Sequence, residues 1–102
     1  MSAYCIVDID VHDPEKMAEY SKVVGAMTAR HGGRYLVRSP EVKPLEGGWT
    51  PRFLVVIEFP DMPALEGFFA SEEYAPLKAI RHAAAHARSV AVEGLAPVVV
   101  AA

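Results

Sequence analysis

The sequence predicts one small α+β domain with the element order strand, helix, strand, strand, helix, strand. Apolar and polar residues alternate with the period of a β-strand in residues 3–11, 52–59 and 88–93, and apolar residues recur at helical spacing between them. A length of 102 residues with 52% hydrophobic and 23% charged content is typical of a single globular domain. We assign residues 1–95 to this domain and residues 96–102 to an apolar C-terminal tail.

The first strand and the first helix are marked by their boundaries. Alternation predicts a strand over residues 3–11. Asp13 is a typical helix cap, and Pro14 suits the first helical position because proline lacks the N–H that would be unpaired there. Gly32 can end the helix with a positive φ. We expect this helix over residues 14–30.

The middle of the chain predicts a hairpin with a long connection. Residues 34–39 and 52–59 have strand composition. Residues 40–51 between them contain three prolines and a pair of glycines, which interrupt regular structure. Loops of this length in small domains are often functional.

The last third of the chain predicts a helix and a final strand. Asp61 can cap a helix that extends through Ala70, and Ser71 restarts a helical turn, so we expect a break near Ser71. Alternation returns in residues 88–93 and ends at Gly94.

This element order is that of the ferredoxin-like βαββαβ fold, a four-stranded antiparallel sheet with two helices on one face. The face without helices is expected to be half apolar, which is more than most monomers expose. Its expected side chains are Tyr4, Ile6, Asp8, Asp10, Leu54, Val56, Glu58, then Arg34, Leu36 and Arg38 from the second strand, and Ser89, Ala91 and Glu93 from the last. We predict a homodimer that buries this face, on the order of 1,600 Å² in total.

Several segments resemble a known family. The segments HGGRYLVR (31–38), PR (51–52), VVIEFP (55–60), FASEEYAPL (69–77) and VEG (92–94), together with Arg81, resemble the domain of unknown function 1330 family over nearly all of residues 3–95. The resemblance implies a member of the dimeric α/β-barrel superfamily, in which two ferredoxin-like protomers join sheet to sheet around a lumen. That superfamily includes cofactor-free oxygenases, lactone isomerases and haem-handling proteins, so small-molecule chemistry enters by analogy.

Charged residues on the face of the sheet without helices are the first candidates for a ligand site in this lumen. They are Asp8, Asp10, Arg34, Arg38 and Glu58. Burial and like-charge contact would raise the pKa of one carboxyl group enough for proton transfer. The alternative is that these charges form ion pairs between the two subunits and do no chemistry.

Two further candidates lie near the expected mouth of the lumen. His31 ends the first helix, where the helix dipole stabilises a protonated imidazole, and it serves equally well as a helix cap. Trp49 in the long loop could stack on a planar ligand or anchor the loop to the partner subunit.

Other reactive residues receive no chemical role. The single cysteine, Cys5, lies in a strand and is expected to be a buried packing group. His82 and His86 have the spacing of two metal ligands, but no third ligand is evident, so we predict no metal and no cofactor. Haem binding would need a histidine that faces the lumen, and neither of these is expected to do so.

Charge and hydropathy limit the partners. A net charge of −3 without a run of basic residues argues against nucleic acid, and no apolar run approaches the roughly 20 residues that span a membrane. We predict a cytoplasmic homodimer that binds a small molecule or is an orphan enzyme, with proton transfer or cofactor-free oxidation as its chemistry. The competing hypothesis is a non-catalytic assembly module. The sequence leaves open whether the protein is an enzyme.

Overall fold

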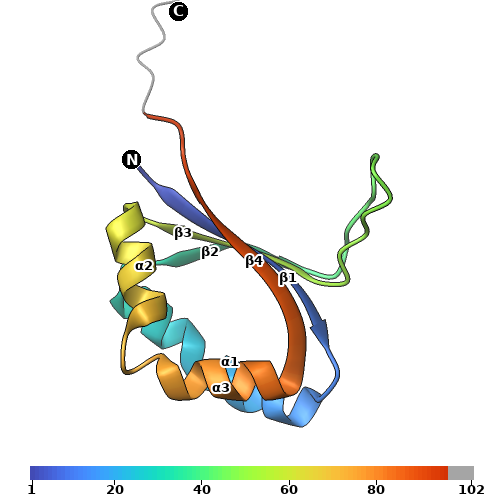
Figure 1. The fold of residues 1–102 in the computed structure, drawn as a ribbon, viewed down its shortest axis with the longest axis horizontal. Helices are drawn as coiled ribbons and strands as arrows, with labels where there is room; N and C mark the ends of the chain where they lie inside the picture. The colour runs from blue at the N-terminus through green and yellow to red at the C-terminus, as the bar shows by residue number, and fades with distance from the viewer. Residues whose placement is uncertain (97–102) are drawn as a thin grey trace, which may run out of the picture.

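The computed structural model describes residues 1–96, which form a four-stranded antiparallel sheet with three helices on one face (Figure 1). The elements are β1 (Ala3–Val11), α1 (Pro14–Arg30), β2 (Arg34–Ser39), β3 (Leu54–Phe59), α2 (Met62–Ala70), α3 (Ala75–Ala84) and β4 (Ala85–Glu93). The predicted ferredoxin-like α+β fold is confirmed. Most of the predicted apolar tail lies outside the described residues. No helix within residues 1–96 is long and apolar enough to cross a membrane.

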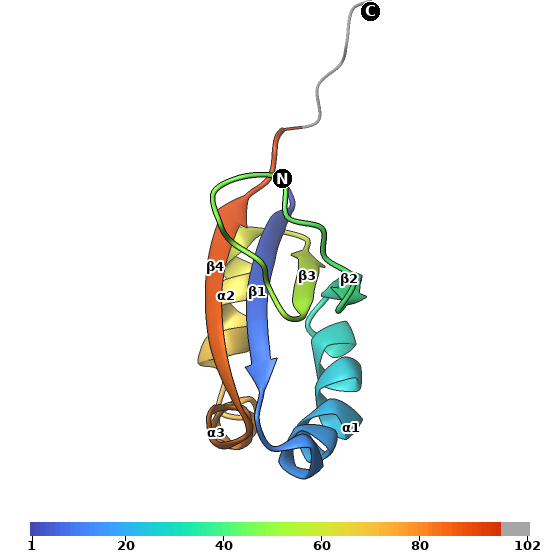
Figure 2. The same cartoon turned by 90° about the vertical axis from the view of Figure 1, so that its right-hand side faces the viewer.

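The sheet has the strand order β2-β3-β1-β4, and every neighbouring pair is antiparallel. Figure 2 shows this order across the sheet, with α2 behind the strands and α1 and α3 toward the bottom of the view. We call the helix-covered side the inner face and the other side the outer face.

Helix caps form where the sequence predicts them. The Asp13 carboxylate accepts a hydrogen bond from the backbone N–H of Lys16 at 3.2 Å, and Asp61 accepts one from Ala64 at 2.8 Å. Gly32 ends α1 with a φ of +83°. These local interactions explain why the bounds of α1 match the prediction.

The second helical region contains two helices rather than one. At the break, the Ser71 hydroxyl donates to the carbonyl of Phe68 at 2.7 Å and accepts from the N–H of Tyr74 at 3.2 Å. This serine therefore ends α2 and leads into α3. The predicted break near Ser71 is confirmed.

The junction of α3 with β4 has no loop, because Ala84 ends the helix and Ala85 begins the strand. Both alanines are buried. The carbonyl of Ala84 accepts hydrogen bonds from the N–H groups of His12 and Asp13, at 2.9 and 3.0 Å. β4 therefore begins three residues earlier than predicted, while β3 begins two residues later, at Leu54.

An aromatic cluster packs one end of the inner face. Phe59 from β3, Phe68 from α2 and Tyr74 before α3 are each at most 1% exposed. The ring centroids of Phe59 and Phe68 are 5.6 Å apart, and those of Phe68 and Tyr74 are 4.9 Å apart. This cluster holds α2 and the start of α3 against the sheet.

The register of β4 corrects the predicted composition of the outer face. Val90 lies opposite Ile6, and Val92 lies opposite Tyr4. Directly opposed residues share a face of the sheet, so the valines point outward. Ser89, Ala91 and Glu93, which were expected there, pair with Val7, Cys5 and Ala3 and so belong to the inner-face set instead. The outer face is therefore more apolar than predicted.

A β-bulge in β2 corrects the position of Arg38. Tyr35 pairs with Ile57, but after the bulge Val37 pairs with Val56 and Arg38 with Val55. The extra residue reverses the alternation, so Val37 points to the outer face and Arg38 to the inner face. The sequence prediction had these two residues on the opposite faces.

Candidate ligand-binding site

The acidic side chains of the outer face are paired within their own subunit. One carboxylate oxygen of Asp8 accepts hydrogen bonds from the indole N–H of Trp49 at 3.1 Å and from Arg88 at 3.0 Å. Asp10 lies 3.7 Å from Arg52. Asp8 therefore joins the long loop, through Trp49, to the edge strand β4.

Glu58 is paired in the same way at the other end of the outer face. Its carboxylate accepts hydrogen bonds from the guanidinium of Arg34 at 2.7 Å and from the hydroxyl of Tyr4 at 3.0 Å. Arg34 and Glu58 are also directly opposed in the β2–β3 register. The ion pair joins β2 to β3.

These contacts lower the carboxyl pKa values on the outer face. The hydrogen bond from Trp49 is the main cause that holds the pKa of Asp8 below its ordinary value, against the opposing effect of burial. The hydrogen bond from Arg34 does the same for the pKa of Glu58. Within one subunit the pKa values of these two carboxyl groups are thus lowered, and the raised carboxyl pKa expected in a lumen between two subunits stays a prediction.

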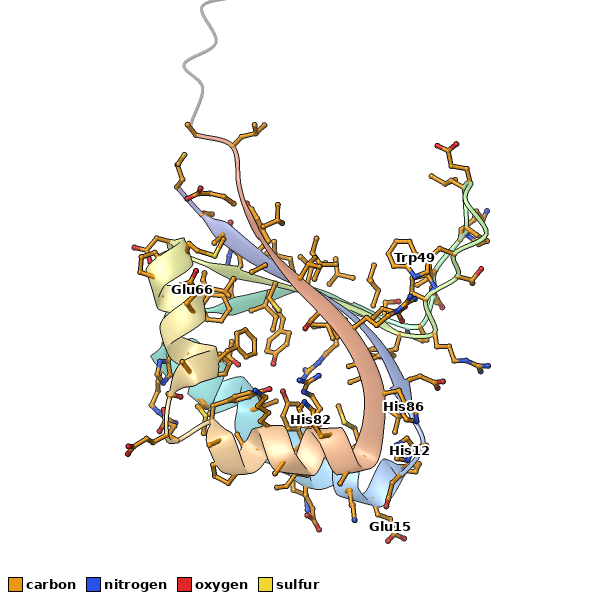
Figure 3. The ribbon with its side chains drawn as sticks, in the orientation of Figure 1. His12, Glu15, Trp49, Glu66, His82 and His86 are labelled. Atoms are coloured by element: carbon orange, nitrogen blue, oxygen red, sulfur yellow. The ribbon has the colours of Figure 1, made fainter. Side chains whose placement is uncertain are left out.

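A hollow on the outer face lies beside Trp49. It has a volume of about 390 Å³ and is lined by Ile6, Asp8, Trp49, Arg88, Ser89 and Val90. Trp49 is half exposed and projects from the loop that stands away from the helices (Figure 3). Its indole N–H anchors this loop to the tryptophan's own subunit, a contact that neither sequence hypothesis for Trp49 included.

His31 lies on the helix side of the molecule. It caps α1, and its Nε2 lies 2.7 Å from a carboxylate oxygen of Glu73. Its ring packs edge-on against Phe68, with 5.1 Å between centroids. His31 thus joins the end of α1 to the α2–α3 turn, and the capping interpretation describes these contacts.

A second, more enclosed space lies between α1 and the inner face; we call it the sheet–helix cavity. Its volume is about 340 Å³. α1 packs mainly against α3 rather than closely on the sheet, which leaves this space open. The walls are largely aliphatic and aromatic, with Val7, Ile9 and Val11 from β1, Met17, Tyr20, Ser21 and Val24 from α1, Tyr35 and Arg38 from β2, Phe53, Val55, Ile57, Phe69 and Arg81.

Two arginines bring positive charge to this cavity. The guanidinium of Arg38 lies 4.5 Å above the ring of Tyr35, in a cation–π contact at the exposed end. Arg81 comes from the last turn of α3, and its Nε is buried without a hydrogen-bond partner among the described residues. No carboxylate and no imidazole line the cavity within residues 1–96.

The partly buried Tyr20 and the buried Tyr74 are hydrogen-bonded to one another. The hydroxyls of Tyr20 and Tyr74 are 3.0 Å apart. Burial, and then the neighbouring Tyr74, raise the pKa of Tyr20 well above its ordinary value. Tyr20 therefore stays protonated, and it offers the cavity a neutral hydroxyl rather than a base.

The remaining reactive residues form no metal site in the described part of the chain. His12 and His86 lie side by side, with ring centroids 4.8 Å apart, whereas His82 projects elsewhere from α3 (Figure 3). Cys5 is buried, as predicted, and burial raises its pKa to about 11. A thiol in this state is a poor nucleophile.

The family model for the domain of unknown function DUF1330 matches residues 2–95. The chain belongs to the DUF1330 family. No curated protein sequence matches this DUF1330 chain.

Solved structures of the same fold resemble this DUF1330 protein. RPA0582, a protein of unknown function from Rhodopseudomonas palustris, has a TM-score of 0.75 at 16% identity, over 94% of this chain and 84% of that one. SnoaB, a cofactor-independent oxygenase from Streptomyces nogalater, has a TM-score of 0.65 at 15% identity, over 96% and 97%. An antibiotic biosynthesis monooxygenase has a TM-score of 0.57 at 16% identity, over 94% and 100%. At these identities the likeness shows the fold alone.

Arg81 of this DUF1330 chain was not among the candidate site residues predicted from the sequence. A signal for its position was nevertheless present. Arg81 follows the buried residues Tyr74 and Leu77 by seven and four positions, so helical spacing places it on the buried stripe of α3. A charged residue on such a stripe is uncommon and indicates a polar interaction in the interior.

Proposed function

We propose that this DUF1330 protein binds a small, largely apolar organic molecule in the sheet–helix cavity. The observation that carries this proposal is the cavity itself. Its 340 Å³ falls within the roughly 300–1,000 Å³ of small-molecule sites, and it combines apolar walls with a few convergent polar groups. The paired acids of the outer face offer less for a ligand, because each already has a cationic or N–H partner.

We propose in addition that two copies join through their outer faces. Val37, Val90 and Val92 on this face are 39%, 61% and 45% exposed. A second copy would remove them from water, and the closed barrel would leave Asp8, Asp10, Arg34, Trp49 and Glu58 facing the lumen. The lumen site therefore stays a prediction, as does the cytoplasmic location.

Cofactor-independent oxygenation is the second candidate, favoured by the likeness to SnoaB and by the guanidinium of Arg81 at the cavity. In such a reaction one atom of molecular oxygen becomes the oxygen of a carbonyl group that replaces a CH₂ group of the ligand, and the other atom leaves with the two hydrogens as one molecule of water. The cavity lining offers no side-chain base within residues 1–96, so the ligand itself must be acidic. Oxygen uptake that requires an added ligand would support this candidate.

The ligand proposal is tested by NMR titration of the ¹⁵N-labelled protein with a mixture of neutral and anionic bicyclic aromatic compounds. We expect shifts at Val7, Val55 and Ile57, which line the cavity. Val24→Phe fills the cavity and should abolish these shifts. Val23→Phe is the matched control, because Val23 directly precedes Val24 in α1 but is 46% exposed.

The titration separates the alternatives. Shifts confined to Ile6, Asp8 and Val90 would overturn the cavity proposal in favour of the lumen. A dimer that binds none of the compounds would favour a non-catalytic assembly module.

The dimer proposal is tested by light scattering after size exclusion. Val90→Asp places an unpaired charge in the expected interface and should give monomers. Val23→Asp introduces the same charge on the exposed side of α1 and should leave the dimer intact. A monomeric native protein would overturn the proposal.

A further inference from the structure

Arg81 is partly buried, and its buried Nε indicates what kind of ligand the sheet–helix cavity selects. Arg81 contributes to none of the ion pairs found within residues 1–96, and its Nε has no acceptor there. A buried donor without a partner is costly, and natural proteins seldom retain one without a functional reason. A bound molecule that brings an acceptor removes this cost.

Arg81 stands where two cavities meet. The sheet–helix cavity shares Val7, Phe69 and Arg81 with a second cavity of about 210 Å³ that lies toward β4. Residues of β1 and of α1 line the first cavity together with Arg81, so its side chain is reached from both elements. A ligand in either cavity therefore has access to the guanidinium.

Both cavities carry cationic groups and no acids. Arg38 and Arg81 line the first cavity, and Arg81 and Lys78 line the second, while no aspartate or glutamate from residues 1–96 lines either. Walls of one sign with low-dielectric surroundings attract the opposite charge. This contrasts with the outer face, where each arginine has a carboxylate beside it.

We propose that the ligand is an apolar organic acid and that Arg81 binds its carboxylate. The inference rests on the proposed function of the cavity. Guanidinium and carboxylate match in geometry and form two parallel hydrogen bonds, which supply the missing acceptor for Nε. The hydrocarbon part of the molecule lies against the side chains of Val24, Phe53 and Val55.

The test compares two compounds of the same shape, 2-naphthoate and 2-naphthamide, by isothermal titration calorimetry. We expect the native protein to bind the acid about 10- to 100-fold more tightly than the amide, the range for a hydrogen bond to a charged group. Arg81→Gln should abolish this preference, and circular dichroism together with urea unfolding checks that the variant is folded. Arg81→Lys keeps the charge without the paired donors and should restore part of the preference.

Arg88→Gln is the matched control, because Arg88 is an arginine of the outer face that pairs with Asp8. It should keep the full preference for the acid. If acid and amide bind equally well to the native protein, the cavity proposal survives and the organic-acid proposal is overturned. If neither compound binds, the proposed function itself fails. A preference that persists in Arg81→Gln removes Arg81 from the role proposed here.

Discussion

On the outer face of the sheet, Asp8, Asp10 and Glu58 each have a partner in the same subunit, whereas on the inner face the Nε of Arg81 has none among the described residues. The outer charges lie at the surface, where ion pairs form at little cost but contribute little to stability. The inner charge lies among apolar side chains, where an unpaired donor is costly. The more informative polar group for ligand binding is therefore the unpaired one, although the outer face carries more charge.

Two neighbouring residues of β3 test how differently the faces contribute to stability. Ile57 is 5% exposed on the inner face, and Val56 lies on the outer face. Ile57→Ala should lower the free energy of unfolding by about 2–5 kcal/mol at every protein concentration. Val56→Ala should destabilise mainly the dimer, so its effect depends on concentration. Urea unfolding at two protein concentrations measures both, and equal, concentration-independent losses would contradict the distinction.

The thiol of Cys5 tests whether the inner face is closed to solvent near β1. Burial raises its pKa from 9.0 to about 11, a shift of about two pH units. The thiolate fraction at pH 8 is then about 100-fold lower than in an unshifted thiol, so Ellman's reagent should react at least about 100-fold more slowly. The urea-unfolded chain is the control. Rapid labelling of the native protein would show that this part of the inner face opens.

Gly33 tests the packed end of the inner face. A Cβ at this position would lie 2.7 Å from the Thr28 side chain and 2.9 Å from the ring of Phe59. Gly33→Ala should therefore cost about 1–3 kcal/mol in thermal or urea unfolding. Gly25→Ala in α1 is the control, since a Cβ there meets nothing within 4 Å, and it should stabilise by about 0.5–1 kcal/mol. If Gly33→Ala left the free energy of unfolding unchanged, this end of the inner face would be as loosely packed as the cavity.

Asp8 tests the outer face, where the expected stability effect is smallest. The hydrogen bond from Trp49 lowers the pKa of Asp8 in the folded protein. The stability that this contact contributes is therefore fully present above the pKa of an ordinary aspartate, about 3.9, and is lost as the pH falls through the lower pKa of folded Asp8. Emission of Trp49, the only tryptophan, should change with a midpoint below pH 3.8. Asp8→Asn should remove this transition at a cost below about 1 kcal/mol. Asp10→Asn is the control and should keep the transition in Trp49 emission. If the transition survives in Asp8→Asn, a group other than Asp8 causes it.

The sequence predicts best what local interactions determine. The bounds of β1, α1 and β2 are correct because alternation, the Asp13 cap and the glycines after α1 act within a few residues. The face of each strand is harder to predict. One extra residue in β2 exchanges the faces of the sheet to which Val37 and Arg38 point. In β4 the small residues Ser89 and Ala91 alternate with valines, and this pattern does not reveal which set faces the helices.

The candidate site could be predicted only in part. Asp8, Asp10, Arg34 and Glu58 do lie on the outer face, as alternation requires. The contacts of Asp8 with Trp49 and of Asp10 with Arg52, however, depend on the loop that brings those two residues back to β1. The sheet–helix cavity depends on the distance of α1 from the sheet. No pattern within a single helix or strand encodes such a distance, and the packing of α1 against α3 sets it.

The junction between α3 and β4 has a mechanical consequence. Flexible connections let neighbouring elements turn independently, but Ala84 passes directly into Ala85, and two backbone N–H groups hold the carbonyl of Ala84. We therefore expect the edge strand and the last turn of the helix to move together. Arg81 is three residues from this junction, so we expect a twist imposed on β4 at the outer face to displace the guanidinium on the inner face.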